Sequence, residues 1–430
     1  MHTCVNIPEV FFHYIWKHKL LTNNIRTGDG ETISILYSGI HNTDSGPDFL
    51  CARIKIGQTV WAGNVEIHVR ASDWYKHKHH KDAAYNNVIL HVVAEDDMPV
   101  RDKSGRKLPS LCIADAYDKN LLDRYRSISQ NMLWVPCQEM INSIDKIHVT
   151  GRLNAEAIQR LYEKAAAIRE ELAQLKNDWE ECCYRVISRQ FGAKVNVSAF
   201  EMLTRTLPVK VLMKEHGELV RTEALLFGQS GLLNMRVRGR YPHALKKEHA
   251  FLAAKYRLSP MPGYLWKFMR IRPAAFPTIR IAHLAALYSQ HQSIFREVIE
   301  RESIARISRL FKVTASSYWD KHFIFDRISR KQVKTFGAQS IQLLLINAII
   351  PLIHLYGQEM NKPELCDRAI AFLEALPPEN NAIIRKWSSL GIEASNSLES
   401  QGLLQLKHTR CDNKKCLECS IGHKILQKHN

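Results

Sequence analysis

The chain has 430 residues with 60 Lys and Arg against 43 Asp and Glu, which gives a formal net charge of +17 at pH 7. Hydrophobic residues make up 45% of the chain and charged residues 24%, which excludes intrinsic disorder and fits a globular protein of two or three domains. The positive charge favours a polyanionic partner, nucleic acid ahead of an anionic membrane surface, over a protein that is basic without a charged partner.

Targeting and membrane signals are weak in this sequence. Charged side chains interrupt the apolar N-terminal run, so we expect no secretory signal peptide. The most apolar stretch, residues 341–356, contains Gln342, Asn347 and Pro351 and is shorter than about 20 residues, so we expect a buried helix and no membrane partner. The ten cysteines lack the spacing of a disulfide framework, which indicates a reducing, cytoplasmic location where clustered cysteines bind metal.

The first hundred residues predict a small α/β domain. Apolar residues at helical spacing predict a helix over residues 8–20. Alternating or β-rich runs predict strands over residues 32–37, 49–56, 60–69 and 88–94. Gly57-Gln58 is expected to form a hairpin turn, and Ser72 to cap a helix over residues 73–85. The predicted order of elements is therefore αβββαβ.

Helical patterns dominate from about residue 150 onward. We expect helices over residues 154–190, 197–217, 243–257, 280–312, 331–355, 363–375 and 398–406. The predicted organisation is an α/β domain over residues 1–110, a connecting region over 111–150, a larger, mostly α-helical domain over 151–406 and a Cys/His tail over 407–430.

Two carboxylates are predicted to meet at the end of the sheet. When the hairpin is folded about its Gly-Gln turn, Asp48 lies beside Glu66 and His68 to within one residue of register. Glu66 and His68 share a strand face because side chains alternate. Such carboxylates suit Mg²⁺ or Mn²⁺, which would polarise a phosphodiester, and Glu9 on the preceding helix could assist. The alternative is that Asp48 begins a turn and Glu66 lies on a solvated strand face.

Pro47-Asp48 and Glu66-Ile67-His68, on this order of elements, resemble the PD-(D/E)XK superfamily of restriction and repair nucleases. The resemblance covers roughly residues 8–95. It implies that Asp48 and Glu66 hold the catalytic metal and that a helix-one glutamate, here Glu9, assists. The superfamily usually has a Lys, which orients the attacking water, where this chain has His68.

The replacement of that Lys leaves three alternatives for the chemistry. His68 could act as the base near neutral pH. Lys76 or Lys78, from the next predicted helix, could take the place of the missing Lys. If neither does so, the domain binds nucleic acid without cutting it.

The whole chain also resembles an uncharacterised bacterial family, the domain of unknown function 2851. The matching stretches are GPDF, GNVEIHV, SDWYKH, YNNVILHVV, EALLFGQSGLL, FPTIRIAHLAAL and the Cys-rich tail. This resemblance implies a bacterial, cytoplasmic protein and supplies no reaction.

A run of histidines and lysines follows the carboxylates at residues 75–82. One interpretation is a solvated basic helix face, on which His77 and Lys81 lie one turn apart. In another, His77 contacts phosphate or supports catalysis beside the carboxylates. In a third, His77, His79, His80 and Asp82 form a separate zinc site, although their order does not match the His-x-His-x-Asp-His pattern of metallo-β-lactamases. His91 is expected to be a hydrogen-bonded core residue.

Cysteines and histidines cluster at the end of the sequence, at His408, Cys411, Cys416, Cys419 and His423. Because Zn²⁺ takes four sulfur or nitrogen ligands, we expect the three cysteines with His423 or His408 to form a structural zinc site. An iron–sulfur cluster would require a fourth cysteine from elsewhere, such as Cys137 or Cys4. The alternative is that the thiols pack in a terminal helix.

The segment 236–280 carries eleven Lys and Arg residues and one acidic residue, Glu248. The cations expected to contact nucleic acid are Arg236, Arg238, Arg240, Lys246, Lys247, Arg257, Lys267, Arg270 and Arg272. Interleaved aromatic residues would stack on bases while the cations follow the phosphates. The alternative is that the aromatic side chains lie in the core and only the cations are outside.

The sequence therefore predicts a metal-dependent nuclease that hydrolyses phosphodiester bonds of DNA or RNA. The α/β domain would hold the metal, and the basic helical domain would bind the nucleic acid. One alternative is a non-catalytic nucleic-acid-binding protein with a degenerate nuclease fold. The other is a zinc-dependent hydrolase that uses the His77–Asp82 cluster.

Overall fold

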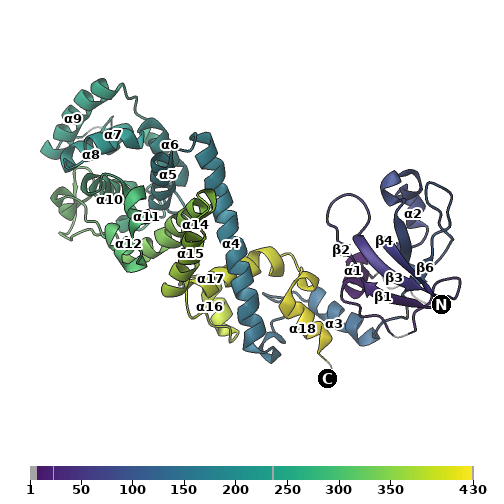
Figure 1. Ribbon diagram of the computed structural model, residues 1–430. Coiled ribbons are helices and arrows are strands. Elements are labelled where there is room, and N and C mark those ends of the chain that lie inside the picture. Colours follow the sequence, from purple (N-terminus) through teal and green to yellow (C-terminus); the bar gives the residue numbers. More distant parts are fainter. Residues whose placement is uncertain (1–6, 23, 235–236, 429–430) are drawn as a thin grey trace. The chain divides into compact units, whose positions relative to one another are not determined.

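The computed structural model of the chain (Figure 1) describes residues 7–22, 24–234 and 237–428. The chain divides into two compact units: the first comprises residues 1–148 and 408–430, and the second residues 149–407. The first unit contains a mixed sheet with helices, and the second is mostly helical. The prediction of an α/β region followed by a mostly helical one is confirmed, and 55% of the structure is helix.

The sheet of the first unit combines an antiparallel part with a parallel part. Its strands are β1 (Ile33–Tyr37), β2 (Ile40–His41), β3 (Phe49–Ile56), β4 (Thr59–Arg70), β5 (Val88–Glu95) and β6 (Ser110–Cys112). Their order is β1-β3-β4-β5-β6, with β2 paired beside β3. Strands β1, β3 and β4 run antiparallel, whereas β5 is parallel to β4 and β6 to β5. The predicted strands are confirmed; β2 and β6 are short and were not predicted.

The hairpin between β3 and β4 has the predicted turn. Gly57 adopts a left-handed φ of 58°, which a glycine tolerates without a steric penalty. Arg53 faces Ala62, in the expected register, but a bulge between Phe49 and Ala52 shifts the pairing by one residue, so that Phe49 faces Val65. This shift brings Asp48, which precedes β3, level with Glu66 on β4.

The predicted helix over residues 73–85 is wrong. Helix α2 (Asp73–Lys76) is a single turn, and Lys78 then adopts a left-handed conformation with φ 65°. Two short 3₁₀ turns follow, and the Asp82 side chain caps the second by accepting a hydrogen bond from the Ala84 amide. The left-handed conformation at Lys78 ends the helix, so the helical faces expected for this run do not form.

Three helices complete the first unit. Helix α1 (Glu9–Lys17) buries an aromatic face and contacts β4, as predicted. Helices α3 (Lys119–Ser129) and α18 (Ser420–Gln427) were not predicted and contact each other. The Arg124 guanidinium donates to the main-chain oxygen of Leu426 at 3.0 Å. The end of the chain thus packs onto a helix about 300 residues earlier in the sequence.

The second unit is built from helices around one large apolar core. Its helices are α4 (Lys146–Gln174), α5 (Trp179–Phe191), α6 (Val197–Thr206), α7 (Val209–Lys214), α8 (Leu219–Gln229), α9 (Arg240–Tyr256), α10 (Pro277–Gln290), α11 (Ile294–Glu300), α12 (Ile304–Leu310), α13 (Ala338–Leu344), α14 (Ile350–Glu359), α15 (Pro363–Ala375), α16 (Ala382–Ser389) and α17 (Ser397–Gln405). Strands β7 (His322–Ile324) and β8 (Arg327–Ile328) form a small hairpin. Helices α8 and α16 were not predicted.

Several predicted helices are interrupted, each where the local chemistry ends a helix. The pattern over residues 154–190 is divided by left-handed Lys176 and Asn177, after which Asp178 caps α5. The pattern over 197–217 is divided at Pro208, which lacks an amide hydrogen. The helix predicted over 280–312 is three helices, α10 to α12.

Residues Ala338–Glu359 form a continuous helical stretch, with a π-helical turn between α13 and α14. By length and composition it is the one helix in the described parts of the chain that could cross a membrane. However, 67% of its apolar window is buried inside the protein, which is typical of a core helix.

We predict opposite effects for two helical glycines of the second unit. A Cβ on Gly402 in α17 would lie 2.2 Å from the main-chain oxygen of Leu153 in α4, so Gly402→Ala should lower the free energy of unfolding by about 1–3 kcal/mol. Nothing lies within 4 Å of a Cβ on Gly151 in α4, so Gly151→Ala should raise the free energy of unfolding by about 0.5–1 kcal/mol. Urea denaturation of both variants is the measurement, and equal stability of the two would contradict this packing.

Candidate metal centre of the first unit

Two carboxylates interlock at the bulged end of the β3–β4 hairpin. The Asp48 amide donates to Glu66 Oε2 at 3.1 Å, and the Ile67 amide donates to Asp48 Oδ2 at 2.9 Å. Each carboxylate is thus fixed by the main chain of the strand that carries the other. The bulge creates this geometry, because it is what brings Asp48 level with Glu66.

Glu66 is 4% exposed, and imidazoles surround its free oxygen. His68 Nε2 lies 3.6 Å and His79 Nε2 3.3 Å from Glu66 Oε1. His68 follows on the same strand face, whereas His79 comes from the first 3₁₀ turn after the left-handed Lys78. Because the predicted helix is broken at Lys78, His79 lies beside the Glu66 carboxylate.

Three imidazoles form a chain from the core to the surface. His68, 2% exposed, lies between His91 Nε2 at 2.9 Å and His77 Nδ1 at 3.1 Å, and His77 is exposed. Among the described residues, buried His91 Nδ1 has no hydrogen-bond partner. If His91 carries its proton on Nε2, no buried N–H lacks an acceptor. His91 Nε2–H then donates to His68 Nδ1, and His68 Nε2–H donates to His77 Nδ1. His91 is thus a hydrogen-bonded core residue, as predicted.

Helix α1 contributes two further side chains to this centre. Glu9 and His13 lie one helical turn apart, with Glu9 Oε1 3.9 Å from His13 Nε2. His13 Nε2 also lies 3.4 Å from Asp48 Oδ2. Glu9 was predicted and His13 was not, although the i, i+4 spacing of two polar residues in an apolar helix was a visible signal.

The two carboxylates have opposite pKa shifts. Burial, together with the charge of Asp48, raises the pKa of Glu66 to about 9. Burial would raise the pKa of Asp48 too, but contact with His13 and the Ile67 amide holds the pKa of Asp48 below its usual value. Near neutral pH, Asp48 is therefore ionised and Glu66 is protonated. Burial also raises the pKa of Glu9.

The histidines around Glu66 are neutral bases. Burial and neighbouring imidazoles lower the pKa of His68 to about 3, and those of His79 and His91 to about 4. A neutral imidazole offers a lone pair to a metal ion or to a proton. His68, His77 and His79 place ligand atoms within 4.8 Å of one another. Carboxylate oxygens and imidazole nitrogens together make a donor set that suits a divalent metal.

The predicted catalytic residues are not all at this centre. Asp48, Glu66, His68 and His77 converge, and Glu9 lies beside His13. Lys76 instead extends into solvent and pairs with Asp73 at 3.4 Å.

The cysteines of the tail line a cavity together with Cys137, and the predicted histidines have other contacts. Cys137, Cys411, Cys416 and Cys419 line one small cavity. His423 Nδ1 bonds to the Tyr14 hydroxyl at 2.9 Å, and His408 lies 3.5 Å from Asp412. Cys4, named as another possible ligand, lies outside the described residues.

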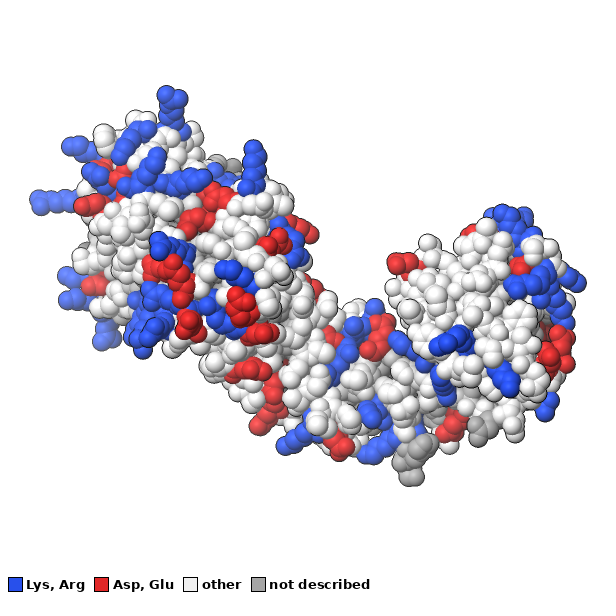
Figure 2. Space-filling view, in the orientation of Figure 1, with Lys and Arg blue, Asp and Glu red and all other residues white. Residues whose placement is uncertain are grey.

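The predicted nucleic-acid-binding cations belong to the second unit. Those that are described are all exposed, namely Arg238, Arg240, Lys246, Lys247, Arg257, Lys267, Arg270 and Arg272. Arg236 lies outside the described residues. Figure 2 shows Lys and Arg side chains gathered over the end of this unit that contains α7, α8 and α9. Of the interleaved aromatics, Phe251 and Tyr264 are 60% and 83% exposed.

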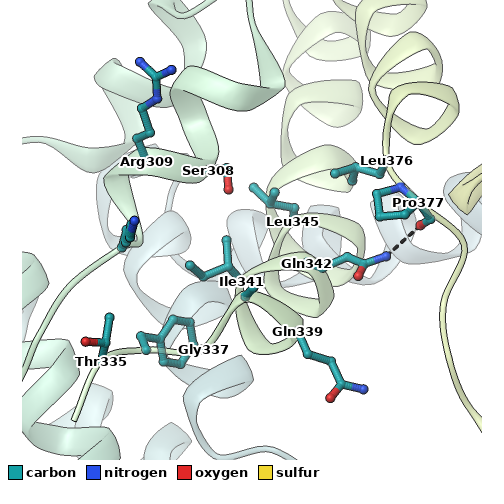
Figure 3. A pocket seen from close by; sticks show the side chains of 13 residues that line it. Ser308, Arg309, Thr335, Gly337, Gln339, Ile341, Gln342, Leu345, Leu376 and Pro377 are labelled. Atoms are coloured by element: carbon teal, nitrogen blue, oxygen red, sulfur yellow. Dashed lines mark hydrogen bonds between the residues drawn. The ribbon is translucent and has the colours of Figure 1, made fainter. Parts of the chain in front are cut away.

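A larger cavity, of about 570 Å³, lies in the second unit near α13 (Figure 3). Gln342 crosses one side of it and donates to the main-chain oxygen of Pro377 at 2.7 Å. Its described lining is largely apolar, with Arg309 and Lys312 as the charged residues, so it offers neither carboxylates nor imidazoles to a metal. Among the described residues, the one group of three close metal-ligand side chains, His68, His77 and His79, lies in the first unit.

A buried carboxylate–imidazole cluster at the end of a mixed sheet thus defines a candidate metal-binding protein. The chain belongs to the family described as "Protein of unknown function (DUF2851)", whose sequence profile matches residues 9–382. This span includes the carboxylate–imidazole centre and the basic segment, and Cys411 to Cys419 lie beyond it. Comparison with curated proteins gives no match, and comparison with solved structures gives none either.

We predict that a divalent metal ion displaces one proton when it binds at this centre. Glu66 holds a proton up to a pKa of about 9, and a cation binds the ionised form. The affinity for Mn²⁺ should therefore rise about tenfold per pH unit between pH 6 and 8, with about one proton released in calorimetry.

Two variants test the origin of that proton. Glu66→Gln should remove both the pH dependence and the proton release. Glu95→Gln, which alters an exposed carboxylate paired with Arg70, should retain both. Proton release that persists in Glu66→Gln would contradict the assignment.

Proposed function

We propose that this chain is a metal-dependent phosphodiesterase that cleaves nucleic acid. The observation that carries the proposal is the interlock of Asp48 and Glu66 beside His68 and His79. Two acidic side chains held against each other, one of them buried, need a cation to be ionised together. A buried, perturbed carboxylate pair among neutral bases is typical of a catalytic site.

The topology of the sheet supports a PD-(D/E)XK-like arrangement. The strands expected for that superfamily correspond to β1, β3, β4 and β5, three antiparallel strands followed by one parallel to the third. Asp48 lies at the start of β3, and Glu66 and His68 lie two residues apart on β4. Helix α1 contacts β4 and carries Glu9. The order and direction of these strands therefore support the proposed resemblance alongside the short motif.

The donor atoms favour one group of metals. Carboxylates alone suit Mg²⁺ or Mn²⁺, whereas imidazole nitrogen suits zinc and other transition metals. Asp48, Glu66 and His79 would hold a metal at this centre, and we favour Mn²⁺ or Zn²⁺ over Mg²⁺ as its occupant. When bound, the metal would polarise the scissile phosphate and lower the pKa of a coordinated water.

The imidazole chain orients the side chains around the attacking water. His68 stands where the superfamily has Lys, and its Nε2 lies 3.6 Å from Glu66 Oε1 and 3.1 Å from His77 Nδ1. Because its Nε2–H donates to His77 and its Nδ1 accepts from His91, His68 would hold these side chains in place and would not itself take the proton of the water. Lys76 is not suited to replace the superfamily's Lys, because its ammonium pairs with Asp73.

The second unit would bind the nucleic acid. Lys246 and Lys247 are exposed on α9, and Phe251 presents an exposed ring on the same helix. Tyr264 is a second exposed ring near Lys267 in the sequence. Cations that follow phosphates and rings that stack on bases bind single strands with little sequence preference.

The zinc-hydrolase alternative is also supported by one observation. His77 and His79 lie with His68 within 4.8 Å of one another, so a zinc ion bound there would share the site with Glu66. His80 and Asp82 do not belong to this set, and Asp82 caps a turn. A zinc-loaded enzyme would therefore use the same carboxylate–imidazole centre.

We predict that the purified chain cleaves DNA or RNA with Mn²⁺, Zn²⁺ or Mg²⁺ and is inactive with a chelator. Asp48→Asn and Glu66→Gln should each reduce metal affinity by at least about 10–100-fold and bring cleavage to background, because each removes an anionic ligand. His77→Ala should slow cleavage by about 10–100-fold while metal affinity changes less, because it removes the hydrogen-bond partner that orients His68.

The matched control is Glu95→Gln, which should cleave like the wild type. Cleavage that survives Asp48→Asn and Glu66→Gln would refute the proposed site. If wild-type protein leaves all tested forms of nucleic acid intact but binds them, the non-catalytic binding protein is the correct description.

We also predict that α9 carries part of the nucleic-acid affinity. Replacing Lys246 and Lys247 with Ala should weaken binding to every sequence and reduce the slope of log K against log salt by about 2, because each phosphate contact contributes about 0.9. As a control, replacing Arg385 and Lys386, which are exposed on α16, with Ala removes the same charge and should leave the slope unchanged. Fluorescence anisotropy over a salt series is the measurement, and identical slopes would contradict a role for α9.

A further inference from the structure

Four cysteines from distant parts of the sequence line one small cavity of the first unit. Cys137 follows α3, and Cys411, Cys416 and Cys419 come from the turns before α18. These four residues, called the cysteine pocket below, make up half of the cavity lining, which also includes Pro136, Arg410, Lys415 and Gly422. Four thiols lining one cavity provide the kind and number of ligands that soft metals take.

We propose that the cysteine pocket binds a metal centre through four thiolates, with Cys137 as the fourth ligand. The site is separate from the carboxylate–imidazole centre and does not depend on nuclease activity. Its occupant is a tetrahedral zinc ion or an iron–sulfur cluster, both of which take four cysteine ligands.

The local structure supports thiolates in this position. Cys416 and Cys419 are buried, and a Cβ on Gly422 would lie 2.2 Å from the main-chain oxygen of Cys416, so this glycine allows α18 to start close to the pocket. The four cysteines and this close start of α18 are therefore part of one local structure.

The histidines expected from sequence have other contacts. His423 bonds to the hydroxyl of Tyr14, and its ring lies 4.1 Å from that of His18. Cys137 is therefore the proposed fourth ligand, the role for which the spacing within the tail predicted a histidine such as His423. The four-sulfur set can form only when the chain has folded, because Cys137 precedes Cys411 by more than 270 residues.

The spread of the sulfur atoms bears on the occupant. In the described part of the chain, His68, His77 and His79 are the one set of three such donors within 4.8 Å of one another. No three of the cysteine sulfurs therefore lie within 4.8 Å of one another, whereas Zn–S bonds of about 2.3 Å put the sulfurs of a zinc tetrahedron about 3.8 Å apart. Binding of a zinc ion would therefore draw the turns together.

A metal in the pocket would fasten the tail to the body of the first unit. Other bonds already hold it there: Lys414 donates to the main-chain oxygen of Ser129 and Lys428 to that of Ser143, each at 3.0 Å. A link between Cys137 and the tail closes a long loop and so restricts the unfolded chain, as a disulfide does.

The test is metal analysis of the full-length chain purified without oxygen or chelators. We expect about one zinc per chain, or iron with acid-labile sulfide and a brown colour. In protein refilled with Co²⁺, charge-transfer absorption should report four thiolate ligands. The metal should persist in Glu66→Gln, which separates it from the carboxylate–imidazole centre.

Matched variants decide which residue is the fourth ligand. Cys137→Ser should lose the metal, whereas His423→Ala and Cys112→Ser, at an exposed cysteine of the same unit, should keep it. If Cys137→Ser does not fold, mass spectrometry of thiol labelling in the wild type should show the four cysteines protected until a chelator is added. Retention in Cys137→Ser with loss in His423→Ala would overturn the proposal, and so would a wild-type chain that binds neither zinc nor iron at these thiols.

Discussion

The placement of two carboxylates against each other is the constraint on which the first unit depends. The Asp48 carboxylate accepts from the Ile67 amide on β4, and the Glu66 carboxylate accepts from the Asp48 amide beside β3, so neither can turn away without losing a hydrogen bond to the main chain. Such a pair is costly in a structure held together only by packing, because like charges close together and out of water oppose folding. We interpret the pair as a site built for a cation.

The surrounding imidazoles explain how the chain tolerates this arrangement before a cation binds. Glu66 is neutral because it retains its proton, and His68, His79 and His91 are neutral because burial lowers their pKa values. Of the two carboxylates, Asp48 alone is therefore charged until a metal replaces the Glu66 proton. Of the imidazole chain, His77 alone reaches solvent, which gives the buried groups a route for proton exchange.

The sequence was sufficient to predict those features of the fold and the site that local rules determine. Alternation along β4 and the Gly57 turn predicted that Asp48 and Glu66 would meet, and the bulge supplied the last residue of register. Sequence could not show that His91 supports His68, because the parallel pairing of β4 with β5 depends on a crossover. Nor could it show that His79 reaches Glu66, since the left-handed turn at Lys78 replaces a plausible helix.

Tertiary packing decides the remaining features. The contact between His13 and Asp48 requires α1 to lie against the sheet, although the Glu9–His13 spacing was visible. Cys137 joins the tail cysteines only through the packing of α3 and α18, which no local pattern records. In the second unit, α8 was missed because nearly all its side chains are buried, which removes the polar face that marks a surface helix.

The central claim is that Asp48 and Glu66 together hold a divalent metal. Anomalous diffraction from crystals grown with Mn²⁺ tests it most directly, because it locates the ion without reference to activity. The account predicts a peak at bonding distance, about 2.0–2.6 Å, from an oxygen of each carboxylate and from a nitrogen of His79. With saturating Mn²⁺, the absence of a peak between these carboxylates would contradict it.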